Sequence, residues 1–496
     1  MSPTSLHACV SIDPRRESIP YNRAILGQFV EHFHRQVYGG IFEPGSPLAD
    51  ERGFRRDVID ALRELRVPVV RWPGGCFASA YHWLDGVGPA RQPAYDKAWR
   101  VEDPNTFGTD EFVTWCREIG AEPYICTNAG TGTPEEMSDW VEYCNLATEG
   151  RWAGLRRSNG YTAPHAVTFW SIGNENYLSG EMGAKTAAEW GPFVAESAKM
   201  MRRVSPDAKL LAAAVADVDW TLSLLKAAGQ YLDYVSVHGY WDPLWQENRP
   251  SDYLACMARS LEPEATIRKV EQLIGVAGLE GRVAIAFDEW NLRGWHHPSG
   301  NSHEVIAARD KNDDPATYTM ADAVFSAVFL NTCLRHARTV HMANMAPLVN
   351  TRGPLFVHPG GIVRRTTFHV LAMYGSLLAP NLLDSWTGSE DFVAGDRMIP
   401  ALDAVVTSDD GREHTVVALV NRHPTAPVTC EVVFDGKHVA GAWPATLLSA
   451  DHPDAYNDIE HLDRVRPQRI SSSFVDGRIE IPAHSVLICD LDSRSP

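Results

Sequence analysis

The sequence predicts a (β/α)8 TIM barrel followed by an all-β domain, an antiparallel sandwich of jelly-roll-like form. Two observations support this fold class. Between residues 24 and 344, apolar runs rich in β-forming residues alternate with segments of helical periodicity. Beyond about residue 373, the helical periodicity fades and short alternating strands appear, separated by Gly, Pro and Asp. Eight strand–helix units are typical of a closed barrel, although a doubly wound sheet shares the same alternation.

Eight segments are expected to form the barrel, because each is a short, nearly continuous apolar run of the kind buried on both faces of a parallel sheet. These runs lie near residues 24–30, 67–72, 122–127, 167–173, 209–214, 233–238, 283–288 and 338–344. A helix is expected over residues 57–66, where apolar side chains recur at helical spacing. Another is expected to follow Thr109, a favourable N-cap residue.

The remaining strand patterns predict the sandwich. Apolar side chains alternate over residues 5–12, which indicates a half-buried strand with no evident partner in the barrel. Similar alternation marks residues 414–420, 428–434 and 478–481. We therefore expect an N-terminal strand segment (1–16) that joins the sandwich, a catalytic barrel (17–372) and a C-terminal sandwich (373–496).

Composition excludes some classes of partner. The chain has 496 residues and a formal net charge of −18, which argues against a nucleic-acid partner or an anionic membrane surface, because both attract basic patches. Nine cysteines are scattered singly with no CxxC pair, as is typical of reduced thiols inside the cell. The N-terminus has no apolar signal-like stretch, and no apolar run is long enough to span a membrane. We therefore expect a cytoplasmic protein.

Two glutamates follow strand-like runs that lie far apart in the sequence. Glu175 follows the run Phe169–Ile172, and Glu289 follows Val283–Phe287. Barrel enzymes keep their chemistry at the carboxyl ends of the strands. Hydrolysis of a glycosidic bond needs one carboxyl group that donates a proton and another that stays ionised. We interpret Glu175 and Glu289 as this catalytic pair, whereas Asp288 is expected to point to the other side of its strand and brace a helix or loop.

The end of the second strand carries the sequence Arg71-Trp72-Pro73-Gly74-Gly75-Cys76. Arg71 is expected to hold a carboxylate such as Glu289 in its ionised form, although an ordinary buried ion pair is an alternative. The two glycines let the backbone approach a ligand closely. Cys76 either touches the sugar or is a plain buried thiol.

Two other strand ends carry polar side chains. Glu31, after the first strand, is expected to accept sugar hydroxyls, and His238 and Tyr240, after the sixth, are expected to support the nucleophile. His32 and His34 share one strand face, as a metal pair would, but no third ligand has convincing spacing, so we predict no metal. No P-loop, GxSxG elbow or full GxGxxG motif is present, and no cofactor is expected.

Six tryptophans fall near predicted strand ends, where indole faces can stack on sugar rings. They are Trp72, Trp83, Trp99, Trp241, Trp290 and Trp295. Each alone is expected to be a core residue, and their shared location is the functional signal. Trp290 and Asn350 are included among the residues expected to support the site.

These motifs together resemble glycoside hydrolase family 51, the α-L-arabinofuranosidases. The matching stretches are Gly27–His32, Arg71–Phe77, Tyr81–Trp83, Asn105–Thr109, Asn159–Gly160, Gly173–Asn176 and Asp288–Asn291. The resemblance implies a barrel with a β-sandwich and a retaining double displacement. By motif position it implies Glu175 as acid/base, Glu289 as nucleophile, and sugar contacts from Glu31, Cys76, Asn174 and Tyr240.

The chain departs from the family pattern at two places. Pro347 stands where many members have a Gln that helps to bind the furanose. The loop Asn176–Gly180 lacks the Trp and paired glycines that are common there. The resemblance therefore defines the reaction mechanism better than it defines the glycone and the leaving group.

The sequence thus predicts an exo-acting enzyme that removes α-L-arabinofuranosyl units from short oligosaccharides. A β-D-galactofuranosidase or β-xylosidase on the same barrel is the alternative enzyme. A metal-dependent sugar isomerase and a sugar-binding protein without activity are the alternatives from other classes. The resemblance also implies a homo-oligomer, with a hexamer as one form.

Overall fold

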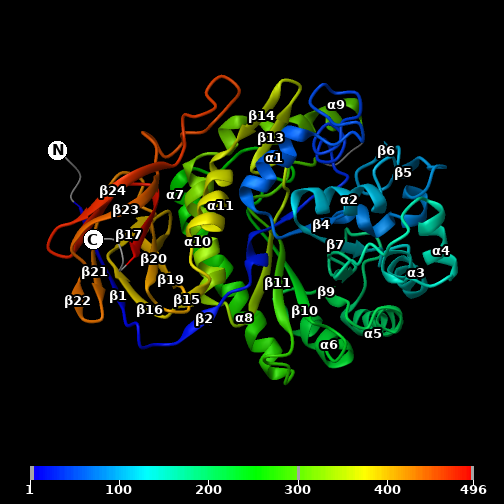
Figure 1. Cartoon of the computed structure of the whole chain (residues 1–496), viewed down its shortest axis with the longest axis horizontal. Coiled ribbons are helices and arrows are strands. Elements are labelled where there is room, and N and C mark those ends of the chain that lie inside the picture. The colour runs from blue at the N-terminus through cyan, green and yellow to red at the C-terminus, as the bar shows by residue number, and fades with distance from the viewer. Residues whose placement is uncertain (1–4, 299–301, 493–496) are drawn as a thin grey trace.

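The computed structural model describes residues 5–298 and 302–492. Eight parallel strands form a closed barrel in chain order, which confirms the predicted (β/α)8 fold (Figure 1). The strands are β3 (Gly27–Phe29), β4 (Val69–Trp72), β7 (Glu122–Thr127), β8 (Phe169–Ile172), β9 (Lys209–Ala213), β10 (Tyr234–Asp242), β11 (Ala284–Arg293) and β12 (Val340–Met345). Each predicted barrel segment contains or overlaps one of these strands, because a strand buried on both faces is marked by its apolar run.

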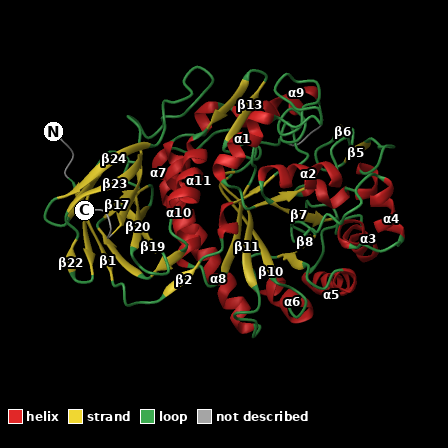
Figure 2. Cartoon of the chain, in the orientation of Figure 1, coloured by secondary structure: helices red, strands yellow, loops and turns green. Residues whose placement is uncertain are grey.

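Helices surround the barrel and separate it from the sandwich (Figure 2). They are α1 (Arg56–Leu65), α2 (Thr109–Ile119), α3 (Pro134–Asn145), α4 (Arg151–Ser158), α5 (Ala187–Val204), α6 (Val218–Ala228), α7 (Tyr253–Ala258), α8 (Glu262–Val276), α9 (His303–Ala307), α10 (Met320–Arg335) and α11 (Thr366–Leu377). Among the described residues, no helix is both long and apolar enough to cross a bilayer. The thiols of all nine cysteines are free.

The predicted start of α2 is wrong by one residue. Gly108 is the N-cap, and Thr109 is the first helical residue. The Thr109 hydroxyl is buried and accepts a hydrogen bond from the indole nitrogen of Trp140 at 3.0 Å. The Thr109 side chain therefore makes a tertiary contact with Trp140 and does not cap the helix.

The sandwich consists of two sheets. The larger has the order β2-β15-β19-β20-β26-β23-β24, and the smaller has the order β16-β1-β21-β22 with β25 also paired to β21. The strands are β1 (Leu6–Ile12), β2 (Ser18–Pro20), β15 (Asn381–Leu383), β16 (Ser385–Ser389), β19 (Leu402–Ser408), β20 (His414–Asn421), β21 (Val428–Phe434), β22 (Lys437–His438), β23 (Gly441–Leu448), β24 (Gln468–Phe474), β25 (Arg478–Ile481) and β26 (Ser485–Asp492).

The sandwich is not wholly antiparallel as predicted. β1 pairs antiparallel with β16 but parallel with β21, where Leu6 to Ile12 run in register with Val428 to Phe434. A strand from the N-terminus can take either direction, because no short turn ties it to its neighbours. The next strand, β2, also joins the larger sheet, so the N-terminal contribution to the sandwich extends to Pro20.

Three short hairpins complete the described part of the chain. They pair β5 (Ala94–Asp96) with β6 (Val101–Asp103), β13 (Leu355–His358) with β14 (Gly361–Arg364), and β17 (Asp391–Ala394) with β18 (Arg397–Pro400).

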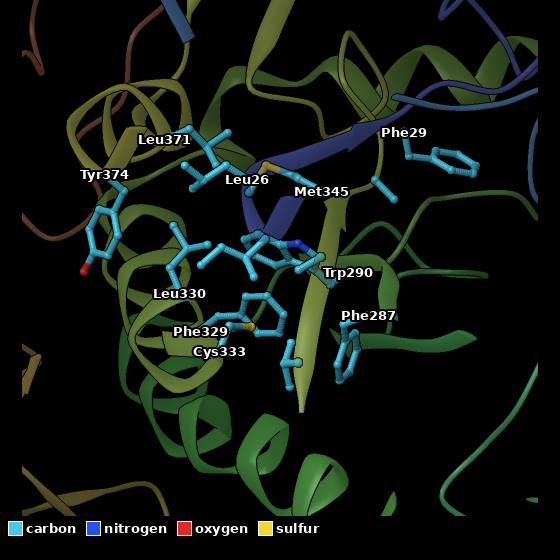
Figure 3. Close-up of a cluster of buried hydrophobic side chains, with 14 of the residues drawn as sticks. Leu26, Phe29, Phe287, Trp290, Phe329, Leu330, Cys333, Met345, Leu371 and Tyr374 are labelled. Carbon is cyan, nitrogen blue, oxygen red and sulfur yellow. The ribbon is translucent and has the colours of Figure 1, made fainter. Parts of the chain in front are cut away.

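Helix α10 lies between the barrel and the sandwich, and its residues from Met320 to Leu334 are buried on every side. The Trp290 indole, on the outer face of β11, stacks on Phe329 of this helix with ring centroids 4.0 Å apart (Figure 3). Trp290 was expected to support the functional site, but it belongs to the hydrophobic layer outside the barrel. Its neighbour Glu289 faces the opposite way.

Candidate active site

Glu289 lies at the carboxyl end of β11 with only 5% of its surface exposed. One carboxylate oxygen accepts a hydrogen bond from Nη1 of Arg71 at 2.5 Å, and the other accepts the hydroxyl of Tyr240 at 2.8 Å. The guanidinium of Arg71 is itself fully buried and reaches Glu289 from β4. Because donors hold both oxygens, the orientation of this carboxylate is fixed beside a permanent cation.

Glu175 follows β8 in a backbone conformation that non-glycine residues rarely adopt, with a φ of +45°. Gly173 just before it also has a positive φ, of +70°. One oxygen of Glu175 lies 2.8 Å from Nδ1 of His238. Donor and acceptor atoms of Glu175, His238 and Glu289 all lie within 4.8 Å of one another. The turn after β8 therefore directs Glu175 toward Glu289.

His238 lies among three carboxylates. Burial by itself lowers its pKa, but Glu289, Asp288 and Glu175 outweigh burial and raise the pKa of His238 to about 10. Its Nδ1 contacts Glu175 at 2.8 Å and Glu289 at 3.6 Å, and its Nε2 lies 3.5 Å from Asp288. At neutral pH the ring is thus an imidazolium that can donate from both nitrogens.

Asp288 was expected to brace a helix or loop, and this prediction is wrong. Its carboxylate faces the barrel interior, where it accepts the Tyr124 hydroxyl at 2.6 Å and lies 3.4 Å from Nε of Arg71. The charges of Arg71 and His238 hold the pKa of Asp288 below its usual value, against the effect of burial. Asp288 therefore supports Arg71 and His238 from beneath the catalytic pair.

An irregularity in β11 explains why two successive acids face inward. Three steps along β11, from Ala286 to Glu289, pair with two steps along β10, from Ser236 to His238. A β-bulge of this kind inserts one residue and breaks the alternation of side chains. Asp288 keeps the inward phase of Ala286, and the extra residue turns Glu289 inward as well.

Glu31 is buried after β3, and one of its oxygens accepts the backbone N–H of Phe77 at 2.9 Å and the indole N–H of Trp99 at 3.0 Å. Burial, together with the charge of Glu289, raises the pKa of Glu31 well above its ordinary value. A Cβ atom at Gly74 would lie 2.6 Å from the Glu31 side chain. The sequence predicted that a ligand would approach the backbone closely at this glycine, but the Glu31 side chain occupies that position.

Asn174 offers an unused donor beside the catalytic groups. Its side-chain oxygen accepts Nη2 of Arg71 at 2.8 Å, whereas its buried Nδ2 has no partner among the described residues. A buried amide donor is normally satisfied by protein, water or ligand. Its place between Arg71 and Glu175 makes it available to a bound hydroxyl group.

Glu181 is a further carboxyl group of the site, and the sequence analysis missed it. Its oxygen accepts the Ser79 hydroxyl at 2.5 Å, and atoms of Cys76, Glu175 and Glu181 lie within 4.8 Å of one another. Burial raises the pKa of Glu181 to about 7. Glu181 directly follows the loop Asn176–Gly180, and no strand-like run precedes it, so the sequence carried no signal for it.

The loop that carries Glu181 is firmly held. The ammonium group of Lys185 donates to the backbone carbonyls of Ala129 at 3.0 Å and Gly183 at 3.2 Å. Gly183 also lies so close to Gly130 that a Cβ atom there would come within 2.2 Å of the Gly130 backbone. Only glycine permits this contact, which fixes the loop against the end of β7.

Glu181 should make stability depend on pH in a defined direction. Its pKa is raised from 4.5 to about 7 on folding, so its contribution is complete below pH 4.5 and is lost as pH rises to about 7. Glu181→Gln removes this loss. The difference in free energy of unfolding between the variant and the original chain should therefore shift in favour of the variant by up to about 3 kcal/mol as pH rises from 4.5 to 8. Urea denaturation at the two pH values measures the difference.

The control for this experiment is Glu149→Gln, because the Glu149 side chain is 95% exposed. It should show no such change between the two pH values. An equal difference for Glu181→Gln at both pH values would contradict the raised pKa of Glu181.

Other residues expected at the site serve the surrounding structure. The Asn350 side chain donates to the backbone carbonyl of Arg35 and accepts the backbone N–H of Val357, so both ends of its amide hold neighbouring loops. His32 contacts Asp103 through Nδ1 at 2.6 Å and accepts the Trp72 indole through Nε2 at 3.0 Å. Both ring nitrogens of His32 are therefore engaged.

The six tryptophans divide into two groups. Trp99 binds Glu31, and Trp295 lies edge-on to Tyr240 with ring centroids 6.4 Å apart, so these two line the site. The hydrophobic core includes these two as well as Trp72, Trp83 and Trp290, and Trp241 is partly buried and packs against it. Strand-end position alone did not separate the groups, because aromatic side chains fill the space above a barrel as readily as they bind sugars.

In the part of the chain that the structure describes, two sets of side chains could geometrically converge on a metal ion, namely Cys76, Glu175 and Glu181, and Glu175, His238 and Glu289. Metal ligands must be deprotonated. Burial raises the pKa of the Cys76 thiol well above its ordinary value, and the pKa of His238 is about 10. With no metal bound, these pKa values keep both groups protonated.

Comparisons with known proteins agree with this geometry. Residues 61–258 match the family described as "Alpha-L-arabinofuranosidase 1 domain", and residues 288–485 match "Alpha-L-arabinofuranosidase C-terminal domain". The chain is 34% identical to the "Intracellular exo-alpha-(1->5)-L-arabinofuranosidase" of Halalkalibacterium halodurans, with 96% of each chain covered. It is also 34% identical to "Alpha-L-arabinofuranosidase C" of Emericella nidulans, with 90% of each covered.

Solved structures give the same result. The family 51 α-L-arabinofuranosidase of Thermotoga petrophila is 32% identical, with a TM-score of 0.87 over 98% of this chain and 100% of the other. The arabinose complex of the Thermotoga maritima enzyme matches with the same identity, TM-score and coverage. Identity at this level over nearly the whole length, with the same fold, establishes that the chain belongs to glycoside hydrolase family 51, the α-L-arabinofuranosidases.

Proposed function

We propose that this chain is a retaining, exo-acting α-L-arabinofuranosidase that releases single arabinofuranosyl units from short oligosaccharides. The observation that carries the proposal is the separation of the two glutamates, whose nearest carboxylate atoms lie within 4.8 Å. Retaining glycosidases hold their carboxyl groups roughly 5–5.5 Å apart, whereas inverting enzymes need about 6.5–9.5 Å to admit a water molecule. The exo mode and the sugar are supported by the printed names of the relatives.

In the first step, Glu289 attacks the anomeric carbon and forms a glycosyl ester. The bond between that carbon and the leaving oxygen breaks, and Glu175 transfers its proton to the leaving oxygen. Arg71 and Tyr240 keep the attacking carboxylate oriented through their bonds of 2.5 and 2.8 Å to its two oxygens. His238 donates to Glu175 and so compensates the charge that remains when Glu175 has lost its proton.

In the second step, Glu175 acts as a base. It takes a proton from water, the water oxygen attacks the anomeric carbon, and the ester bond to Glu289 breaks. Two displacements at one carbon return the starting configuration. The proton returns to Glu175, and both glutamates recover their initial states.

Glu31, Cys76, Asn174 and Tyr240 are proposed to bind the sugar. Asn174 contributes the unpartnered donor of its amide, and Glu31 contributes a buried carboxyl group next to Trp99. Pro347 has no side-chain donor or acceptor and stands where many family members have a Gln. These four residues are therefore expected to make the polar contacts to which that Gln would contribute. Glu181, beside Cys76 and Glu175, adds a further carboxyl group to the wall of the site.

A panel of nitrophenyl glycosides tests the proposal. The α-L-arabinofuranoside should be hydrolysed with the highest kcat/KM among α-L-arabinofuranoside, β-D-galactofuranoside, β-D-xylopyranoside and α-L-arabinopyranoside. Proton NMR of the first product should show the α anomer before mutarotation, because the configuration is retained. Initial appearance of the β anomer would rule out a covalent intermediate on Glu289. Faster hydrolysis of the xylopyranoside or the galactofuranoside would show that arabinofuranose is not the preferred sugar.

The other expectations from the sequence stay predictions. A cytoplasmic location is supported by the word "intracellular" in the name of one relative, and assembly as a homo-oligomer rests on the resemblance alone. The metal-dependent isomerase is disfavoured because the relatives are named as α-L-arabinofuranosidases.

A further inference from the structure

A cavity of about 640 Å³ lies at the seam between the barrel helices and the sandwich. Helices α8 and α10 and the 3-10 helix η4 (Arg259–Leu261) line one side, and strands β15, β16 and β19 line the other. Figure 1 shows α10 between these strands and the barrel. The volume falls in the range of sites for small molecules. The cavity includes none of the catalytic side chains.

Arg422, which follows β20, is a buried cation in the lining of this cavity, with less than 2% of its surface exposed. Its guanidinium donates from Nη1 to the hydroxyl of Ser260 at 3.3 Å, and its Nε has no hydrogen-bond partner among the described residues. Within those residues, no carboxylate oxygen comes within 4.0 Å of its guanidinium nitrogens, although the charges of Asp403 and Asp391 act on it from farther away. The hydroxyl of Tyr253 is buried and also has no hydrogen-bond partner among those residues. In its ionised form it would attract Arg422.

The acids of the cavity lining already have cations of their own. Asp403 pairs with Arg335 at 3.1 Å. Asp384 pairs with Arg16 at 2.7 Å, and Glu264 pairs with Arg268 at 2.6 Å. Arg422 is therefore the lining cation without a matched anion. A buried charge is costly unless it is paired, and burial lowers the pKa of Arg422 accordingly.

We propose that this cavity is a second ligand site, which binds a small polar molecule through a phosphate or carboxylate group held by Arg422. A planar guanidinium fits either oxyanion with two parallel hydrogen bonds. The hydroxyl-bearing residues Ser385 and Thr387 line the same cavity and suit a polar body such as a sugar. The ligand class is thus a sugar phosphate or a sugar acid.

Calorimetric titration of the full chain tests the site at constant ionic strength. The probes are inorganic phosphate, ribose 5-phosphate and glucuronate, with neutral arabinose for comparison. At least one anion should bind with one site per chain and raise Tm in a saturable way. The stronger of the phosphate and carboxylate arms identifies the natural group. Absence of saturable binding by every anion would overturn the proposal.

Two variants locate the binding. Arg422→Met keeps the length of the side chain without its charge and should weaken anion binding at least about tenfold, with aryl-glycoside hydrolysis unchanged. Arg203→Met is the matched control, because Arg203 is exposed on α5, and it should bind as the original chain does. Equal affinity in Arg422→Met, or competition between the anion and the glycoside substrate, would contradict the site.

Ser260→Asp provides a test that does not depend on losing Arg422. It places a carboxylate at a position whose oxygen now lies 3.3 Å from the guanidinium. The new charge should pair with Arg422, raise Tm in anion-free buffer and abolish anion binding. A variant with lower Tm and undiminished anion binding would show that Arg422 does not need an anion.

Discussion

Replacing Glu289 by alanine should lower kcat by roughly 10⁴-fold or more for every leaving group, because the variant lacks the carboxylate proposed to attack the anomeric carbon. The loss should be the same for nitrophenyl glycosides and for oligosaccharides, since the nucleophile is needed however well the leaving group departs. Mass spectrometry of the chain mixed with an activated fluoroglycoside should detect no glycosyl adduct. The measurement is kcat with both substrate types.

A graded series separates this loss from damage to the fold. Tyr240→Phe removes one hydrogen bond to Glu289 and leaves its charge, so kcat should fall only by about tenfold. Glu289→Gln keeps a partner for Arg71 and should melt close to the original chain while remaining inactive. A Glu289 variant that azide restores with retained configuration would reverse the two proposed roles.

Replacing Glu175 by alanine should affect the two substrate types very differently. A sugar leaving group needs a proton, so hydrolysis of oligosaccharides should fall by about 10²–10⁴-fold, which is the usual contribution of general acid catalysis. A nitrophenolate leaves without a proton, so the first step on that substrate should be partly spared. The second step still needs a base, and the glycosyl ester on Glu289 should therefore accumulate.

Azide should then restore turnover of Glu175→Ala on the nitrophenyl substrate, because it attacks without help from a base. The product should be a glycosyl azide of retained configuration, since it forms from the covalent ester. Azide should have no effect on the original chain at the same concentration. A burst of nitrophenol followed by slow turnover is the expected time course, and equal losses on both substrates would show that Glu175 is not the acid.

The sequence determined the architecture and the chemical centre. Apolar runs that are buried on both faces mark parallel strands locally, so the barrel could be predicted from periodicity. Carboxyl ends of such strands meet at one face of a barrel. This rule predicted that Glu175 and Glu289 approach each other and that Arg71 lies nearby, although more than a hundred residues separate the two glutamates.

Only the tertiary structure decided which way side chains point where regular alternation fails. The bulge in β11 turns Glu289 inward beside Asp288, which already faces inward, and leaves Trp290 outside, against α10. Register is set by the neighbouring strands, so a single strand does not encode it. The parallel pairing of β1 with β21 has the same origin, because no turn between them fixes a direction.

Charge states were also beyond the sequence. Glu181 has a pKa of about 7 because the folded loop buries it beside Cys76, and His238 has a pKa of about 10 because three carboxylates from two strands surround it. Arg422 has no ion-pair partner among the described residues, because the acids of the cavity around it pair with other cations. Desolvation and charge pairing depend on distances between segments far apart in the chain, and these distances exist only after folding.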